Sequence, residues 1–109
     1  MVQEVPFGVR VSAGVGVRVL RLQGVIGESA LDSLREASIE LLRLGFPVRV
    51  DCREVIDLAP EALSMLVALK AGLALQDQPF SLVALAPELI RYVGEEAEAL
   101  VGPHAAGAA

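Results

Sequence analysis

Hydrophobic and polar residues alternate along the first part of the chain at a spacing that predicts strands. Apolar residues occupy every second position of residues 7–13, with small or charged residues between them. The glycine-containing segment 14–16 then predicts a tight turn, because glycine adopts the positive φ angles that hairpins need. Residues 17–22 are apolar except at Arg18 and Arg21, which is typical of a strand in the middle of a sheet.

Two longer segments carry apolar residues at helical spacing. Residues 29–44 are predicted to form the first helix, with one apolar side. This helix is expected to end at Gly45, because glycine commonly terminates helices. Residues 60–75 begin with Pro60, which suits a first helical turn because its missing N–H has no partner there. Opposite its apolar side, this second helix carries a stripe of mostly small residues: Glu61, Ser64, Ala68, Ala71 and Leu75. We interpret this stripe either as a partner surface or as a surface covered by the C-terminal segment.

Shorter elements complete the pattern. Strands are predicted at 47–50 and 80–84, and a final helix at 88–101 with an interruption. The polar residues of 51–54 predict a loop, after which Val55 and Ile56 are expected to return to the interior. Helices between the later strands favour crossover connections, and therefore a mostly parallel sheet that opens with an antiparallel hairpin.

Length and charge narrow the classes of function. A chain of 109 residues with 54% hydrophobic residues predicts one folded domain with an aliphatic core. The net charge of −5 and the scattering of Lys and Arg along the sequence disfavour nucleic-acid binding. No apolar run approaches the length of a membrane-spanning helix, so no membrane insertion is expected. The N-terminus does not resemble a signal peptide, and a cytoplasmic location is expected.

Few residues suggest catalysis. Cys52 follows a buried strand, where a lone cysteine is usually a small apolar filler. His104 stands alone near the C-terminus, and no His/Cys/Asp cluster has the spacing of metal ligands. The sequence therefore predicts no enzyme, and no catalytic, cofactor-binding or metal-binding residues.

The segment from Val55 to Leu63 resembles the centre of a STAS domain, the fold of sulphate-transporter tails and anti-sigma factor antagonists. Members of that family read hydrophobic–Asp–Ser/Thr–Ser/Thr–Gly–Leu between a strand and a helix. Asp57 matches the aspartate of this pattern. Leu58 stands where switchable members are phosphorylated, Ala59 replaces the second hydroxyl residue, and Pro60 replaces the glycine.

The resemblance extends over residues 7–101 and implies the architecture. Residues 24–27 stand where STAS domains usually carry Gly-Glu-Leu/Ile-Asp, and both acids are replaced. Residues 85–88 are similar to the loop before the last helix of the family. The implied α/β fold is a STAS-like mixed sheet of four to five strands, with an antiparallel opening hairpin and otherwise mostly parallel strands, packed with three to four helices. We expect one domain over residues 1–102 and a disordered tail at 103–109.

The resemblance also implies a function and a surface. It implies a non-catalytic, protein-binding regulatory module, similar to a bacterial anti-sigma factor antagonist or stressosome STAS protein that lacks the phosphorylatable Ser/Thr. The expected partner-binding residues are Asp57, Leu58, Ala59, Pro60, Glu61 and Ser64. Leu58 and Ala59 would make this surface permanently apolar, while Asp57 could instead serve only as a helix cap or loop anchor.

Two alternatives for the partner stay open. The first partner class is an anti-sigma factor or a related kinase-like protein, which would place the chain in transcription regulation and signalling. The second is the ATPase of a lipid-transport ABC complex, because stand-alone STAS proteins also serve as subunits of such complexes. A homodimer that uses the small-residue stripe is a further alternative.

Overall fold

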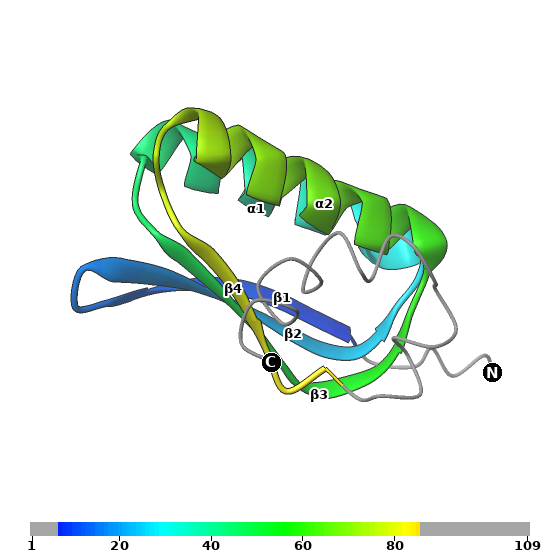
Figure 1. The fold of residues 1–109 in the computed structure, drawn as a ribbon. Coiled ribbons are helices and arrows are strands. Elements are labelled where there is room, and N and C mark those ends of the chain that lie inside the picture. Colours follow the sequence, from blue (N-terminus) through cyan, green and yellow to red (C-terminus); the bar gives the residue numbers. More distant parts are fainter. Residues whose placement is uncertain (1–6, 86–109) are drawn as a thin grey trace, which may run out of the picture.

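The computed structural model describes residues 7–85, which form one mixed sheet and two α-helices (Figure 1). The elements follow in the order β1 (Phe7–Gly14), β2 (Val17–Ile26), a short 3-10 helix η1 (Glu28–Ala30), α1 (Leu31–Leu44), β3 (Val48–Leu58), α2 (Pro60–Leu75) and β4 (Phe80–Val83). The strands lie side by side in the order β1-β2-β3-β4. The first pair is antiparallel and the other two pairs are parallel, which confirms the predicted sheet.

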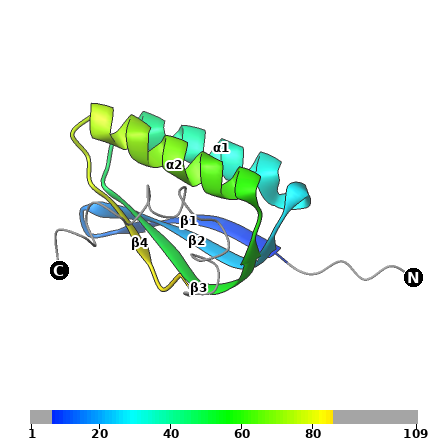
Figure 2. The ribbon, with the colours of Figure 1, turned by 45° about the vertical axis from the view of Figure 1, so that its right-hand side comes forward.

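Both helices cover the same face of the sheet, and α1 and α2 lie side by side in both views (Figures 1 and 2). The core forms between this helix layer and the sheet, from aliphatic side chains of both layers. Its members are Leu20, Leu22 and Ile26 of β2, Val48, Val50, Cys52 and Leu58 of β3, Ala30 of η1, Leu34 and Leu41 of α1, and Ala62, Leu63, Leu66, Leu69 and Leu73 of α2. Burial of these side chains against each other supplies the main driving force for folding.

The turn and helix-end predictions are confirmed at the positions that need glycine. Gly16 adopts φ 69° in the turn between β1 and β2, and Gly45 adopts φ 71° at the end of α1. The N–H of Gly45 donates to the carbonyl of Leu41, which closes the last turn of α1. The second predicted helix, residues 60–75, has the same bounds as α2.

The middle strands are longer than predicted. Residues 51–54 were expected to form a loop, but β3 continues through them to Leu58. Likewise β2 continues to Ile26 instead of ending at residue 22. The polar residues fit the strand because alternate side chains point to opposite faces, and only one face of the sheet is covered by α1 and α2.

In the last part of β3, the register of its pairing with β2 also changes. The pairing register shifts twice along β2, first between Arg21 and Gln23 and again between Gly24 and Val25. Ile56 has no partner on β2 at the second shift and is 67% exposed, so the expectation that it points inward is wrong. The predicted final helix at 88–101 and the tail at 103–109 lie outside the described residues.

Candidate functional site

The candidate site lies where β3 ends and α2 begins. Ala59, the only residue between the two elements, has an extended backbone with φ −65° and ψ 150°. Its N–H donates to the carbonyl of Ile26 at 2.9 Å, and its carbonyl accepts the N–H of Leu63 at 3.0 Å. This residue therefore fixes the start of α2 against the end of β2, and the connection has a defined shape.

The structure separates the predicted site residues into exposed and buried ones. Asp57, Pro60, Glu61 and Ser64 are exposed, and Ala59 is half-buried. Leu58 is only 1% exposed and belongs to the core. Its expected place on an apolar contact surface is therefore wrong, because its side chain packs between the sheet and the helices.

The side chain of Asp57 accepts a hydrogen bond from the backbone of the connection and does not cap α2. Its Oδ1 accepts the N–H of Leu58 at 2.9 Å, and no side chain caps the N-terminus of α2. This contact supports the interpretation of Asp57 as an anchor of the connection and not that of a helix cap. The acidic residue in the first turn of α2 is Glu61, whose charge is favourable near the positive end of the helix dipole.

Positions 57–60 contain no hydroxyl side chain, so this connection offers no serine or threonine for phosphorylation. In the family pattern the hydroxyl stands at position 58, where the structure has a buried leucine instead. The closest hydroxyl along α2 is that of Ser64, one helical turn beyond Pro60. The leucine at position 58 therefore contributes packing to the core.

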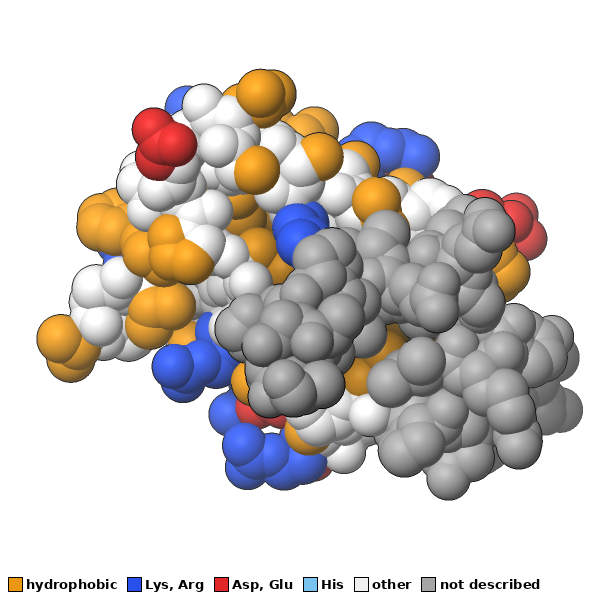
Figure 3. Space-filling model, viewed as in Figure 1, with side chains coloured by type: hydrophobic (Ala, Val, Ile, Leu, Met, Phe, Trp, Pro, Cys, Tyr) orange, Lys and Arg blue, Asp and Glu red, His pale blue; other side chains and the backbone are white. Residues whose placement is uncertain are grey.

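The outward stripe of α2 continues this surface. Glu61, Ser64, Ala68, Ala71 and Leu75 are all exposed, as expected for the side of the helix away from the sheet. Leu75 is 89% exposed, and hydrophobic side chains appear along the helix at the top of the space-filling view (Figure 3). We name the set Asp57, Ala59, Pro60, Glu61, Ser64, Ala68, Ala71 and Leu75 the α2 surface.

Sequence reasoning missed Ile56 as a surface residue. Its exposure follows from the register shifts between β2 and β3, which depend on pairing with a strand distant in the sequence. No local signal in the sequence could reveal this. The exposed aliphatic side chain that precedes Asp57 is consequently Ile56, whereas Leu58 after it is buried.

The other chemical candidates do not form a reactive centre. Burial raises the pKa of the Cys52 thiol from 9.0 to about 12, and the Asp51 carboxylate beside it adds to this shift. The thiol is therefore neutral near pH 7, and a neutral thiol is a poor nucleophile. Among residues 7–85 no group of three or more His, Cys, Asp or Glu side chains is placed to hold a metal ion. His104 lies outside the described residues.

A mixed sheet that begins with an antiparallel hairpin, continues in parallel and carries its helices on one face defines a STAS-type α/β fold. The family model described as "Mlab, STAS domain" matches residues 9–94, and the chain belongs to this family of STAS domains. No match was found among curated proteins. Within residues 7–85, no helix is long and apolar enough to span a membrane.

Two solved structures show the same fold. The anti-sigma factor antagonist SpoIIAA in its unphosphorylated form superimposes with a TM-score of 0.67 at 14% identity, over 83% of this chain and 82% of that one. A structure titled "Crystal Structure Analysis of Mglu" superimposes with a TM-score of 0.62 at 18% identity, over 72% of this chain. The present chain spans only 20% of the length of that second protein.

Proposed function

We propose that this chain is a non-catalytic, protein-binding regulatory module, similar to an anti-sigma factor antagonist, that binds its partner through the α2 surface. The observation that supports the proposal most directly is the connection from Asp57 to Pro60, which is positioned by backbone hydrogen bonds and carries no hydroxyl. A phosphate at this place would add nearly two negative charges. Without a hydroxyl at residues 57–60, the connection cannot gain these charges by serine or threonine phosphorylation.

The composition of the α2 surface fits a protein partner. Small exposed side chains such as Ala68 and Ala71 allow the backbone of another chain to approach closely, and Leu75 offers an exposed aliphatic group. Only Asp57 and Glu61 carry a charge on this surface. A low number of charges to desolvate is a feature that this surface shares with the central part of protein–protein interfaces.

The identity of the partner separates the two open alternatives. We propose purification of the tagged chain from its native lysate, followed by mass spectrometry of the proteins that bind it. A kinase-like anti-sigma factor would support the leading proposal and a cytoplasmic role in transcription regulation. The ATPase of a lipid-transport ABC complex would replace it with the alternative, in which the same module is a transporter subunit.

The binding surface is tested with a pair of charge reversals on exposed helical acids. Glu61→Lys changes the first turn of α2, and Glu36→Lys makes the same change on α1. We expect Glu61→Lys to weaken binding of the purified partner by about tenfold or more, in the range seen when like charges meet at an interface. Equal binding by both variants would exclude the start of α2 as the interface.

The absence of a phosphate switch is tested separately. We expect no phosphate on residues 57–60 after incubation with ATP and a kinase-like partner, measured by intact mass and peptide mapping. Phosphate on a serine elsewhere in the chain, together with a change in partner affinity, would contradict the proposal of a permanently binding-competent form. Leu58→Glu is unsuitable for this purpose because it would place a charge in the core.

A further inference from the structure

The face of the sheet opposite the helices gathers arginines that are far apart in the sequence. Arg10 of β1 lies directly opposite Arg21 of β2, and Arg21 lies opposite Asp51 of β3. Arg49 lies opposite Val19, one position along β2 from the buried Leu20. Since successive side chains of a strand point to opposite faces, the alternation with Leu20 and Leu22 assigns these arginines to the face away from the core.

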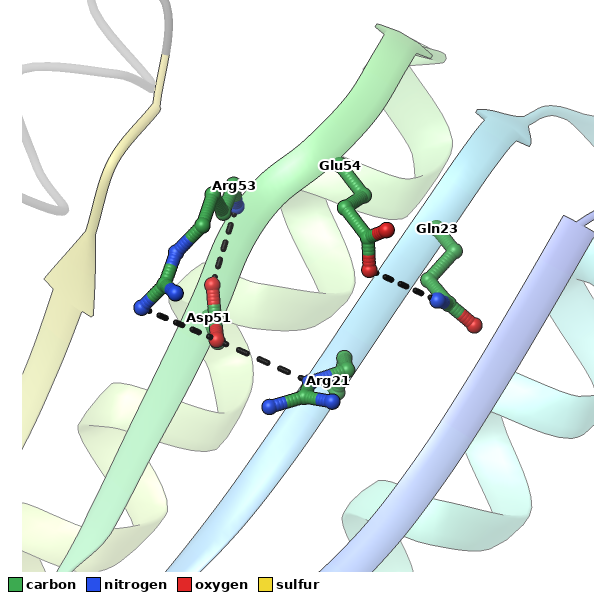
Figure 4. Close-up of polar contacts among 5 residues, drawn as sticks. All are labelled: Arg21, Gln23, Asp51, Arg53 and Glu54. Carbon is green, nitrogen blue, oxygen red and sulfur yellow. Dashed lines mark hydrogen bonds and ion pairs between the residues drawn. The ribbon is translucent and has the colours of Figure 1, made fainter.

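A buried carboxylate organises part of this cluster (Figure 4). Asp51, whose side chain is 8% exposed, forms ion pairs with Arg21 at 3.6 Å and Arg53 at 3.7 Å. Its Oδ1 also accepts the backbone N–H of Arg53 at 3.0 Å. In Figure 4 these side chains stand in front of the strands while the helices lie behind them. Asp51 therefore holds two guanidinium groups at the open face of the sheet.

The cluster has an excess of positive charge. Its four guanidinium groups, those of Arg10, Arg21, Arg49 and Arg53, face two carboxylates, those of Asp51 and Glu54. Glu54 is already engaged by the side-chain amide of Gln23 at 2.7 Å. No ion pair joins Arg10 or Arg49 to any residue in 7–85, although the chain as a whole has a net charge of −5. In Figure 3 basic side chains gather below the sheet, on the side away from the helices.

The clustering of arginines on this face lowers the stability of the sheet, and the fold does not depend on it. Like charges directly opposite on neighbouring strands, such as Arg10 and Arg21, destabilise a sheet. A ligand with negative charge would remove this repulsion. Guanidinium groups are suited to that task because their planar fork of N–H donors matches a carboxylate.

We propose that this face, named here the arginine face, is a second docking surface that binds a short acidic segment of another protein. The half-buried Val19 and Val83 lie on the same face, opposite Arg49 and Asp51, and offer apolar contact that a polypeptide can use and a small anion cannot. The strands are spaced by about 4.8 Å, so the four arginines span the width of a few residues of extended chain.

The net charge argues for a short segment. An extended polyanion, such as a nucleic acid or an anionic membrane, would reach beyond the arginine face and meet the excess of acidic groups on the rest of the protein. A few carboxylates neutralise the local excess without this repulsion. The arginine face lies across the sheet from α1 and α2, so the proposal is independent of the α2 surface.

The test compares two double variants that carry the same net charge. Arg10→Gln with Arg49→Gln removes the two arginines of the cluster that have no ion pair within residues 7–85. Arg35→Gln with Arg43→Gln removes two exposed arginines of α1, which within the described residues form ion pairs only with Asp32 and Glu40 on the same helix. Each double variant changes the net charge from −5 to −7, because two positive charges are lost. Thermal unfolding first verifies that both variants are folded.

Binding is measured by fluorescence anisotropy with a short labelled peptide in which glutamate and leucine alternate, at low and at high salt. We expect salt-sensitive binding that the Arg10/Arg49 variant weakens by about fivefold or more, while the Arg35/Arg43 variant binds like the unmodified chain. Absence of peptide binding, or equal weakening in both variants, would overturn the proposal. Tighter binding to an oligonucleotide or to anionic vesicles, lost in the Arg10/Arg49 variant, would assign the face to that other ligand and would equally overturn it.

Discussion

At the scale of single residues, the burial of side chains around the end of β3 decides which groups a partner can reach. Leu58 was expected on the apolar contact surface, yet it lies in the core. Ile56, expected inside, is exposed. The two residues therefore exchange the roles that the sequence pattern assigns to them, and their variants are expected to differ accordingly.

Shortening Leu58 is expected to destabilise the protein. Leu58→Ala removes buried aliphatic atoms and leaves a cavity, which costs about 2–5 kcal/mol of unfolding free energy. Ile56→Ala shortens a mostly exposed side chain and is expected to change the stability by about 0.5 kcal/mol or less. Chemical denaturation of both variants provides the comparison. A similar loss in both would mean that Ile56 is buried in solution.

The buried thiol of Cys52 predicts a loss of stability at alkaline pH. Its pKa is raised from 9.0 to about 12 in the folded chain, so the folded state holds this proton more tightly than the unfolded state. The resulting stabilisation is fully present below about pH 9 and is lost as the pH rises toward 12, with a slope of at most about 1.4 kcal/mol per pH unit. Cys52→Ala should remove this component from the pH dependence of the unfolding free energy. Parallel curves for the two proteins above pH 9 would contradict the prediction.

At the scale of elements, local signals predicted the ends of the helices and missed the extent of the strands. Pro60 and Gly45 mark helix ends through their own backbone preferences, and both are found where predicted. The continuation of β3 through residues 51–54 depends instead on pairing with β2 and on two register shifts. Such pairing between distant segments leaves no signature in the local pattern, so the strand was mistaken for a loop.

The C-terminal end of α1 offers a direct measure of such a backbone preference. Gly45→Ala is expected to lower the unfolding free energy by about 1 kcal/mol, because an L side chain is strained at φ 71°. Gly27→Ala is the matched control, since its φ is −105° and, among residues 7–85, an added Cβ would meet only Val25, at 3.8 Å. Thermal or chemical unfolding reports both values. An equal effect at the two positions would show that the left-handed conformation of Gly45 is not the cause.

At the scale of the whole molecule, folding brings charged residues together into surfaces that cannot be predicted from the composition of the chain. Lys and Arg are scattered along the sequence, and from this no basic surface was expected. The sheet nevertheless brings Arg10, Arg21 and Arg49 together, because three strands place them in neighbouring positions on one face. The mostly parallel sheet with its antiparallel opening hairpin could be predicted from the alternation of elements, whereas this clustering required the strand order and the register of each pair.

The outward stripe of α2 is, by its size, too small to form a stable homodimer alone. A helix of 16 residues is about 24 Å long and about 10 Å wide, which gives a footprint of roughly 240 Å². Stable interfaces bury about 800 Å² on each partner. We therefore expect light scattering at micromolar concentration to give the mass of one 11.4 kDa chain, both for the unmodified protein and for Ala68→Glu. A mass of two chains that returns to one in Ala68→Glu would show that the stripe joins two copies, and that a partner at the α2 surface must compete with a second copy of the chain.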